Sequence, residues 1–141
     1  MIVEVTRKAH FCAGHRYWCP EWSPAKNHDV FGACANEQGH GHNYSVEVTL
    51  SGPVDPITGM VINLTELDRL IQIYVIERLD HKNLNTDVPE LAGMNPTTEV
   101  LAGFVWDQIV SRVAVGRLVR VRVGESEDLW AERCDHDGPE S

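Results

Sequence analysis

Two histidines one residue apart are the strongest local indication of chemistry in this chain. His40 and His42 stand in the run GHGHN, at the start of a segment whose side chains alternate as in a strand. Alternate residues of a strand point to the same face, so both imidazoles project together. Gly39 and Gly41 allow a ligand to approach closely. The pair supplies half of a zinc site, unless both are surface histidines beside a turn.

A third metal ligand is expected from the first strand-like segment. That segment ends in AHFCAGH and offers His10 and His15. If it pairs with the segment that begins at His40, the end of the first comes near the start of the second. Alternation leaves both candidates open, and the glycine beside His15 favours His15. Three histidines without a fourth protein ligand are typical of a catalytic zinc, with one position open for water or substrate.

Cys34 lies six residues before His40, in a stretch without periodicity. A thiol close to a metal ion and imidazoles can act as a base or a nucleophile. The alternative is a small buried apolar residue, and that interpretation applies more strongly to Cys12, Cys19 and Cys134.

Two acidic positions complete the set of candidate groups. Asp80 beside His81 can orient an imidazole or tune its proton affinity, although polarity at a helix end explains the pair as well. Glu125 ends an alternating segment, and its carboxylate can accept two parallel N–H bonds from the guanidine-like edge of a heterocycle. With Glu127 and Asp128 nearby, a solvated acid is the plain alternative.

Alternation predicts the strands that position these groups. We expect strands over residues 2–11, 43–50, 59–62, 118–125 and 129–133. Residues 16–39 have no clear period and read as a long loop, which is uncommon in a small domain unless the loop has a function.

Two helices are expected between the strands. Asn63 with Glu66 resembles a capping box, and apolar residues at helical spacing continue to Leu79. Thr97 or Thr98 can cap a second helix that continues to Ile109.

The segregation of strands and helices predicts a single α+β domain over residues 1–141. We expect an antiparallel four-stranded sheet with both helices on one face. The edges of such an open sheet need protection, which a closed ring of subunits would provide.

Charge and hydropathy exclude two classes of partner. The formal net charge of the 141 residues is -9, whereas a general nucleic-acid binder needs basic excess to neutralise phosphates. No apolar run approaches the roughly 20 residues of a membrane-spanning helix, and the N-terminus has no secretory signal. We therefore expect a cytoplasmic protein without a membrane or nucleic-acid partner, whose four cysteines are free thiols.

Together these residues resemble the 6-pyruvoyl-tetrahydropterin synthase family, which includes the bacterial 6-carboxy-tetrahydropterin synthases. The resemblance covers nearly the whole chain. The motifs that carry it are HFCAGH at 10–15, FGACANEQGHGHNY at 31–44, DPITGMVINLTEL at 55–67, LDHKNLN at 79–85, PTTE at 96–99 and VGES at 123–126.

The resemblance implies the tunnelling fold, in which the sheets of several subunits join into a β-barrel, usually as a homohexamer of two trimers. It also implies a zinc cofactor. The family's zinc ligands correspond to His15, His40 and His42. Cys34 corresponds to the catalytic cysteine, and Asp80 and His81 to the partners that complete its proton relay.

The substrate implied by the resemblance is a pterin, 7,8-dihydroneopterin triphosphate. Glu125 corresponds to the acid that anchors the pterin ring, and Thr97 and Thr98 line that pocket. The implied reaction is loss of triphosphate to give 6-pyruvoyl-tetrahydropterin. The other branch of the family cleaves the side chain and gives 6-carboxy-tetrahydropterin and acetaldehyde, for queuosine and other deazapurines.

The spacing CANEQGHGH and the phrase GMVINLTEL resemble the pyruvoyl branch, whereas PTTEVLAGFVWDQI looks equally like the carboxy enzymes. The segment WCPEWSPAKNHD departs from both branches. We favour the pyruvoyl product. A zinc-containing pterin-binding protein without turnover, and another zinc lyase or hydrolase, are the alternatives from other classes.

Overall fold

Two long strands form the centre of the fold in the computed structural model, which describes residues 1–135. Strand β1 (Ile2–His15) pairs antiparallel with β2 (His40–Pro53). Every residue of β1 has a partner in β2, and the register ends with His15 opposite His40. This pairing, on which the choice of the third metal ligand depended, brings two sequence-distant histidines to the same end of the sheet.

The sheet has five strands in the order β3-β1-β2-β4-β5. β4 (Arg117–Gly124) and β5 (Trp130–Cys134) extend it antiparallel beyond β2, whereas the two-residue β3 (Lys82–Asn83) pairs parallel to β1. The prediction of a four-stranded antiparallel sheet is therefore wrong, because the sheet is mixed and has five strands. A bridge of two residues has no periodicity by which the sequence could reveal it.

The expected strand at 59–62 is also wrong, because this segment completes a turn. The Asp55 carboxylate accepts hydrogen bonds from the amides of Ile57 and Thr58. Gly59 follows with φ 73°, in the left-handed region that glycine adopts without steric cost. The turn leads directly into the first core helix.

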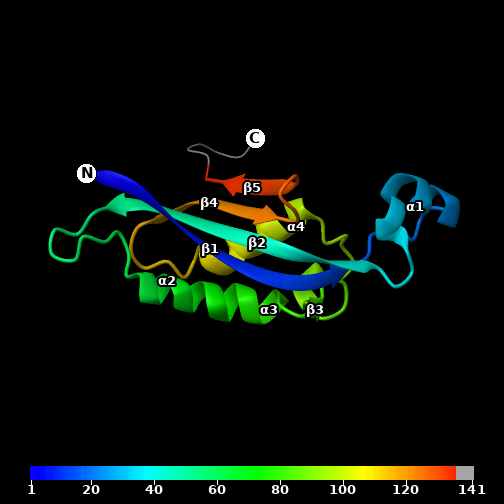
Figure 1. Cartoon of the computed structure of the whole chain (residues 1–141), viewed down its shortest axis with the longest axis horizontal. Coiled ribbons are helices and arrows are strands. Elements are labelled where there is room, and N and C mark those ends of the chain that lie inside the picture. The colour runs from blue at the N-terminus through cyan, green and yellow to red at the C-terminus, as the bar shows by residue number, and fades with distance from the viewer. Residues whose placement is uncertain (136–141) are drawn as a thin grey trace.

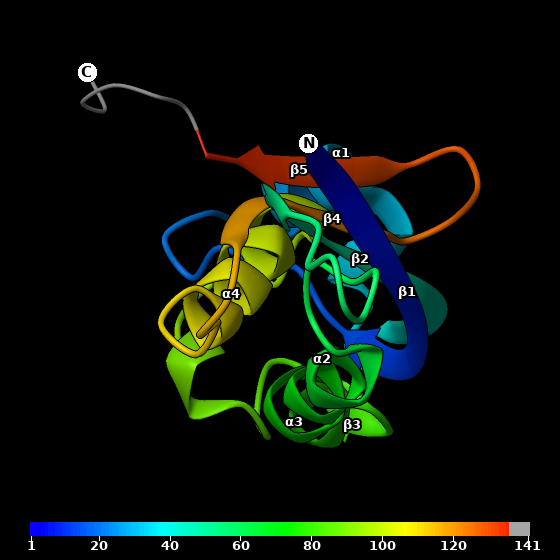
Figure 2. The ribbon, with the colours of Figure 1, turned by 90° about the vertical axis from the view of Figure 1, so that its left-hand side faces the viewer.

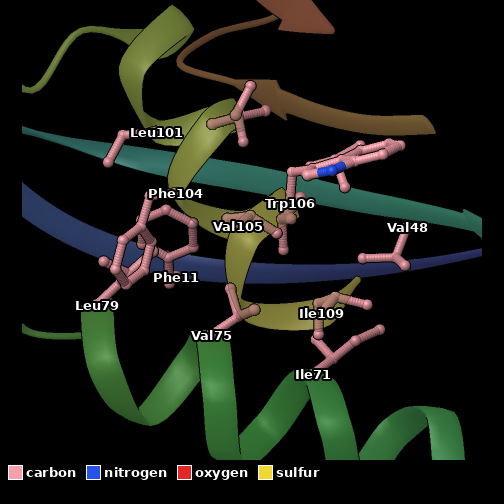
Figure 3. Packing of buried hydrophobic residues seen from close by; sticks show 14 of the residues in the cluster. Phe11, Val48, Ile71, Val75, Leu79, Leu101, Phe104, Val105, Trp106 and Ile109 are labelled. Carbon is pink, nitrogen blue, oxygen red and sulfur yellow. The ribbon is translucent and has the colours of Figure 1, made fainter. Parts of the chain in front are cut away.

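Two helices cover one side of the sheet, as expected (Figure 2). The first consists of α2 (Leu64–Ile71), a π-helical turn η2 (Gln72–Ile76) and α3 (Glu77–Leu79). The second is α4 (Thr98–Ile109). Their apolar faces pack against the odd-numbered side chains of β1 and the even-numbered ones of β2. Members of this core include Phe11, Val48, Ile71, Val75, Leu79, Leu101, Phe104, Val105, Trp106 and Ile109 (Figure 3).

The helix caps agree with the sequence in position but not in every detail. Asn63 caps α2 by accepting a hydrogen bond from the Thr65 amide. The reciprocal capping box is not formed, because the Glu66 carboxylate binds Arg69 instead. For α4 the structure chooses Thr97, whose hydroxyl accepts from the Val100 amide at 3.2 Å.

The segment expected to be a loop contains a helix, α1 (Pro24–Phe31), followed by a 3₁₀ turn η1 (Gly32–Ala35). α1 lies beyond the end of the sheet, apart from the other helices (Figure 1). Ser23 caps it and Pro24 occupies its first turn. The fully buried Asn27 accepts a hydrogen bond from the Cys19 amide and donates to carbonyls of the preceding turn. Hydrophobic periodicity did not predict α1, because this helix contains few apolar residues.

Both sheet edges remain without a strand partner over part of their length among residues 1–135. The outer side of β1 carries β3 only at Ala13 and Gly14, and β5 is the last strand on the other side. A further short 3₁₀ turn, η3 (Pro89–Leu91), lies in the connection to α4. All four cysteines are free. Within the described residues, no helix has the length and apolar character needed to cross a bilayer.

Candidate active site

The three predicted metal ligands meet at one end of the central strand pair. His15 is the last residue of β1, and His40 and His42 are the first and third residues of β2. Their rings are 4.8–5.0 Å apart between centroids. The Nε2 atoms of His15 and His40 are 3.3 Å apart. The register of β1 and β2 therefore brings the three imidazoles together.

The geometry of these residues fits a metal ion. Two nitrogens bound to one tetrahedral zinc at about 2.0–2.1 Å lie about 3.3 Å from each other, which matches the His15–His40 distance. His42 Nε2 is buried and makes no hydrogen bond among the described residues, and Glu125 Oε1 lies 2.6 Å from it. The ligand atoms of the three histidines and Glu125 all lie within 4.8 Å of one another. This cluster can hold a metal ion.

The structure decides between the two candidates for the third ligand. His10 is exposed and lies on the opposite face of β1 from Phe11, Ala13 and His15. His10 does not belong to the cluster. The sequence held the signal, because most apolar residues of this strand stand at odd positions and, of the two histidines, His15 shares their phase.

Burial keeps the His15 imidazole neutral, which is the form that binds a metal. Desolvation, followed by the charges of His42 and His40, lowers the pKa of His15 to about 4. The side chain is fully enclosed, with a relative exposure of the residue of 2%. A proton therefore competes weakly with a metal ion at this position.

The metal-free protein is expected to lose stability in acid because of His15. The pKa of His15 is about 4 in the folded state and near 6.5 when unfolded, so the unfolded chain takes up the proton first. Between pH 6.5 and 4 the free energy of unfolding should fall by up to about 1.4 kcal/mol per pH unit from this group. Urea unfolding in chelator across this range should show a steeper fall for the wild type than for His15→Gln. Parallel curves would contradict the assignment.

Cys34 lies in η1, beside the cluster. Its Sγ is 3.5 Å from His40 Nε2, and its carbonyl accepts a hydrogen bond from the Tyr17 amide at 2.7 Å. Burial, and then the negative charge of Glu125, raise the pKa of the Cys34 thiol. The thiol is therefore placed for proton transfer, but its ionisation needs a cation nearby.

Glu125 follows β4 and reaches into the cluster. Its Oε1 is 2.6 Å from His42 Nε2, although this contact lacks the geometry of a hydrogen bond, and 3.7 Å from His15 Nε2. Its Oε2 accepts a hydrogen bond from the buried Thr98 hydroxyl at 3.2 Å. Thr98 thus orients Glu125, while the hydroxyl of Thr97 is used in the α4 cap.

Asp80 and His81 form a separate pair beside β1. His81 Nδ1 is 3.0 Å from an Asp80 carboxylate oxygen, and the His81 side chain is 81% exposed. The Cys12 amide donates to Asp80 at 2.9 Å, which holds the pKa of that carboxyl below its usual value. Among the described residues, no hydrogen bond or ion pair joins this pair to Cys34. His81 and His42 do line the same groove, of about 370 Å³.

Two tyrosines that the sequence analysis did not identify also contact His15. The Tyr17 ring packs against His15, with centroids 4.5 Å apart. The Tyr44 hydroxyl is 2.8 Å from His15 Nδ1. Burial, and then the charge of Glu125, raise the pKa of both phenols, so both stay neutral. Tyr44 could have been found from strand periodicity, because it follows His40 and His42 at the same spacing on the same face.

The chain is similar to known proteins over most of its length. The sequence model of the 6-pyruvoyl tetrahydropterin synthase family matches residues 4–135. The chain belongs to this family. A family member from Drosophila melanogaster, a 6-pyruvoyl tetrahydrobiopterin synthase, is 51% identical over 108 residues, which are 77% of this chain and 64% of that protein. The alignment thus spans just under two thirds of the fly protein.

Other family members match over more of their length. The 6-pyruvoyl tetrahydrobiopterin synthase of Homo sapiens is 42% identical over 125 residues, covering 89% of this chain and 86% of the human protein. The structure of Caenorhabditis elegans 6-pyruvoyl tetrahydropterin synthase superposes with a TM-score of 0.88 at 33% identity. The superposition covers 96% of this chain and 97% of that one. The expected family and the α+β fold are confirmed.

Proposed function

We propose that this chain is a zinc-dependent tetrahydropterin synthase. It converts 7,8-dihydroneopterin triphosphate to 6-pyruvoyl-tetrahydropterin with loss of triphosphate. The observation that carries the proposal is the convergence of three imidazole nitrogens beside one thiol and one carboxylate. The names of the fly and human relatives support the pyruvoyl product.

We assign the metal ligands to His15, His40 and His42, and the metal to zinc. Neutral imidazoles with a neighbouring thiol suit zinc among the common metal ions. Bound between the three rings, zinc supplies a Lewis acid that polarises the substrate hydroxyls and acidifies the neighbouring C–H. All other steps fall to the side chains of the protein.

Cys34 is the group we assign to proton removal. Its sulfur lies 3.5 Å from His40 Nε2, so the thiolate would stand beside a substrate bound at this cluster and would take the proton from its C–H. His81, held by Asp80, then returns or relays a proton. The exposed His81 and the metal-ligand candidate His42 line the same groove, so a substrate bound in this groove can exchange a proton with His81.

Glu125 is the group we assign to the pterin ring. A carboxylate at this place can accept two parallel N–H bonds from the guanidine-like edge of the heterocycle. Thr98 supports this role because its hydroxyl restrains one carboxylate oxygen. The nearness of Glu125 to His42 also allows a second role, as a fourth metal ligand.

Glu125→Gln is expected to separate these two roles. Loss of the charge should weaken pterin binding about 10- to 100-fold, because a hydrogen bond to a charged group contributes about 1.5–3 kcal/mol. Zinc content should not change. Calorimetric titration with a dihydropterin, together with metal analysis, measures both quantities. The exposed Asp128→Asn serves as the control for a lost negative charge in the same turn. A loss of zinc in Glu125→Gln would identify Glu125 as a metal ligand.

We further propose that the chain assembles into a homohexamer whose sheets join into a barrel. The strand edges without partners at β1 and β5 support this assembly, because exposed edges otherwise invite aggregation. Light scattering coupled to size exclusion should give six times the mass of the 15.8 kDa chain. A monomeric mass would contradict the barrel.

The reaction itself is tested by incubating the purified protein and zinc with dihydroneopterin triphosphate. Mass spectrometry should find a 6-pyruvoyl product and free triphosphate. A 6-carboxy product with acetaldehyde would place the chain in the other branch of the family. Unchanged substrate with bound pterin would support a binding protein without turnover.

A further inference from the structure

Tyr44 is a buried tyrosine whose hydroxyl meets a buried histidine. It lies on β2, is 1% exposed, and its ring stacks on Phe11 with centroids 4.9 Å apart and 9° between the planes. Phe11 is its register partner on β1. The stack fixes the ring, so the hydroxyl is held 2.8 Å from His15 Nδ1.

His15 differs from the other two histidines in what its second ring nitrogen can contact. His15 is 2% exposed, whereas His40 and His42 are both half-buried and within reach of solvent. No described residue hydrogen-bonds Nδ1 of His40 or His42. Within residues 1–135, His15 is the one member of the three with a hydrogen-bond partner at Nδ1, and it is also the most buried of them. A buried ring nitrogen without a partner would destabilise the folded protein.

The direction of this hydrogen bond depends on which nitrogen faces the metal. His15 Nε2 points to the cluster, 3.3 Å from His40 Nε2. A metal ligand must offer a lone pair, so Nε2 carries no proton when a metal is bound. The ring proton then sits on Nδ1, and Nδ1–H donates to the Tyr44 oxygen.

We propose that Tyr44 is a positioning residue for the metal centre. Its hydroxyl accepts the Nδ1 proton of the His15 tautomer whose Nε2 is free, and so holds the ring in the orientation in which Nε2 faces the other two histidines. This inference rests on the proposed zinc site, which it extends by a residue outside the ligand set.

The test compares Tyr44→Phe with the wild type in zinc affinity, measured by competition with a chromophoric chelator. Loss of an outer partner of a metal-bound histidine weakens affinity about 10- to 100-fold, and we expect a loss in this range. Tyr17→Phe is the matched control. Its ring also packs on His15, but no described residue hydrogen-bonds the Tyr17 hydroxyl. Zinc affinity in Tyr17→Phe should equal that of the wild type.

A second measurement needs no substitution. Long-range ¹⁵N–¹H spectra of the wild type with zinc should show a protonated, exchange-protected Nδ1 and an unprotonated Nε2 for His15. Circular dichroism in chelator verifies that Tyr44→Phe is folded. Equal zinc affinity of folded Tyr44→Phe and the wild type, or coordination through Nδ1, would overturn the role of Tyr44 alone. A wild type that takes up no zinc would overturn the metal centre and this proposal with it.

Discussion

His40→Ala is expected to give a folded protein that has lost its zinc and its turnover. His40 begins β2, and its Nε2 faces both His15 Nε2 and the Cys34 thiol. Removing the imidazole leaves two histidines, too few for a catalytic zinc site. Zinc affinity should fall by at least about 100-fold, beyond the range seen when only an outer partner of a ligand is lost. Metal analysis after dialysis and a product assay measure the two losses.

His10→Ala is the matched control for a lost histidine. His10 lies on the same strand as His15 but on the exposed face of the sheet. Its zinc content should equal that of the wild type. Retention of zinc by His40→Ala, or its loss from His10→Ala, would show that the convergence of the three rings does not form the metal site.

Cys34→Ala is expected to keep zinc and to lose turnover. The thiol is next to a ligand but is not needed to complete the three-histidine set, so the metal should stay bound. Loss of a general base costs about 10²–10⁴ in rate, and kcat should fall by that factor. Steady-state kinetics on dihydroneopterin triphosphate with parallel metal analysis separates the two effects.

Cys134→Ala controls for the loss of a half-buried thiol elsewhere. Cys134 ends β5, the strand farthest from β1 in the sheet. Its kinetics should match the wild type. Full activity of Cys34→Ala would remove Cys34 from the mechanism, and loss of zinc in that variant would make the thiol a metal ligand.

Local patterns predicted most of the fold because each rests on short-range chemistry. Alternation placed β1, β2, β4 and β5, since one buried face imposes a period of two on a strand. Helical spacing and the caps at Asn63 and Thr97 placed both core helices. The same patterns failed for β3 and α1. A two-residue bridge has no period, and α1 has no apolar face packed on the core.

The sequence by itself determined the residue types of the site and which of them share a strand face, because alternation has a period of two. The register that sets His15 opposite His40 comes from the structure. Only the tertiary structure decided which groups touch. The contact of Glu125 with His42 and the hydrogen bond of Thr98 to Glu125 depend on how β4 pairs with β2 and how α4 packs against β4. Such contacts join residues far apart in sequence, and their distances follow from packing in three dimensions, which no local pattern encodes.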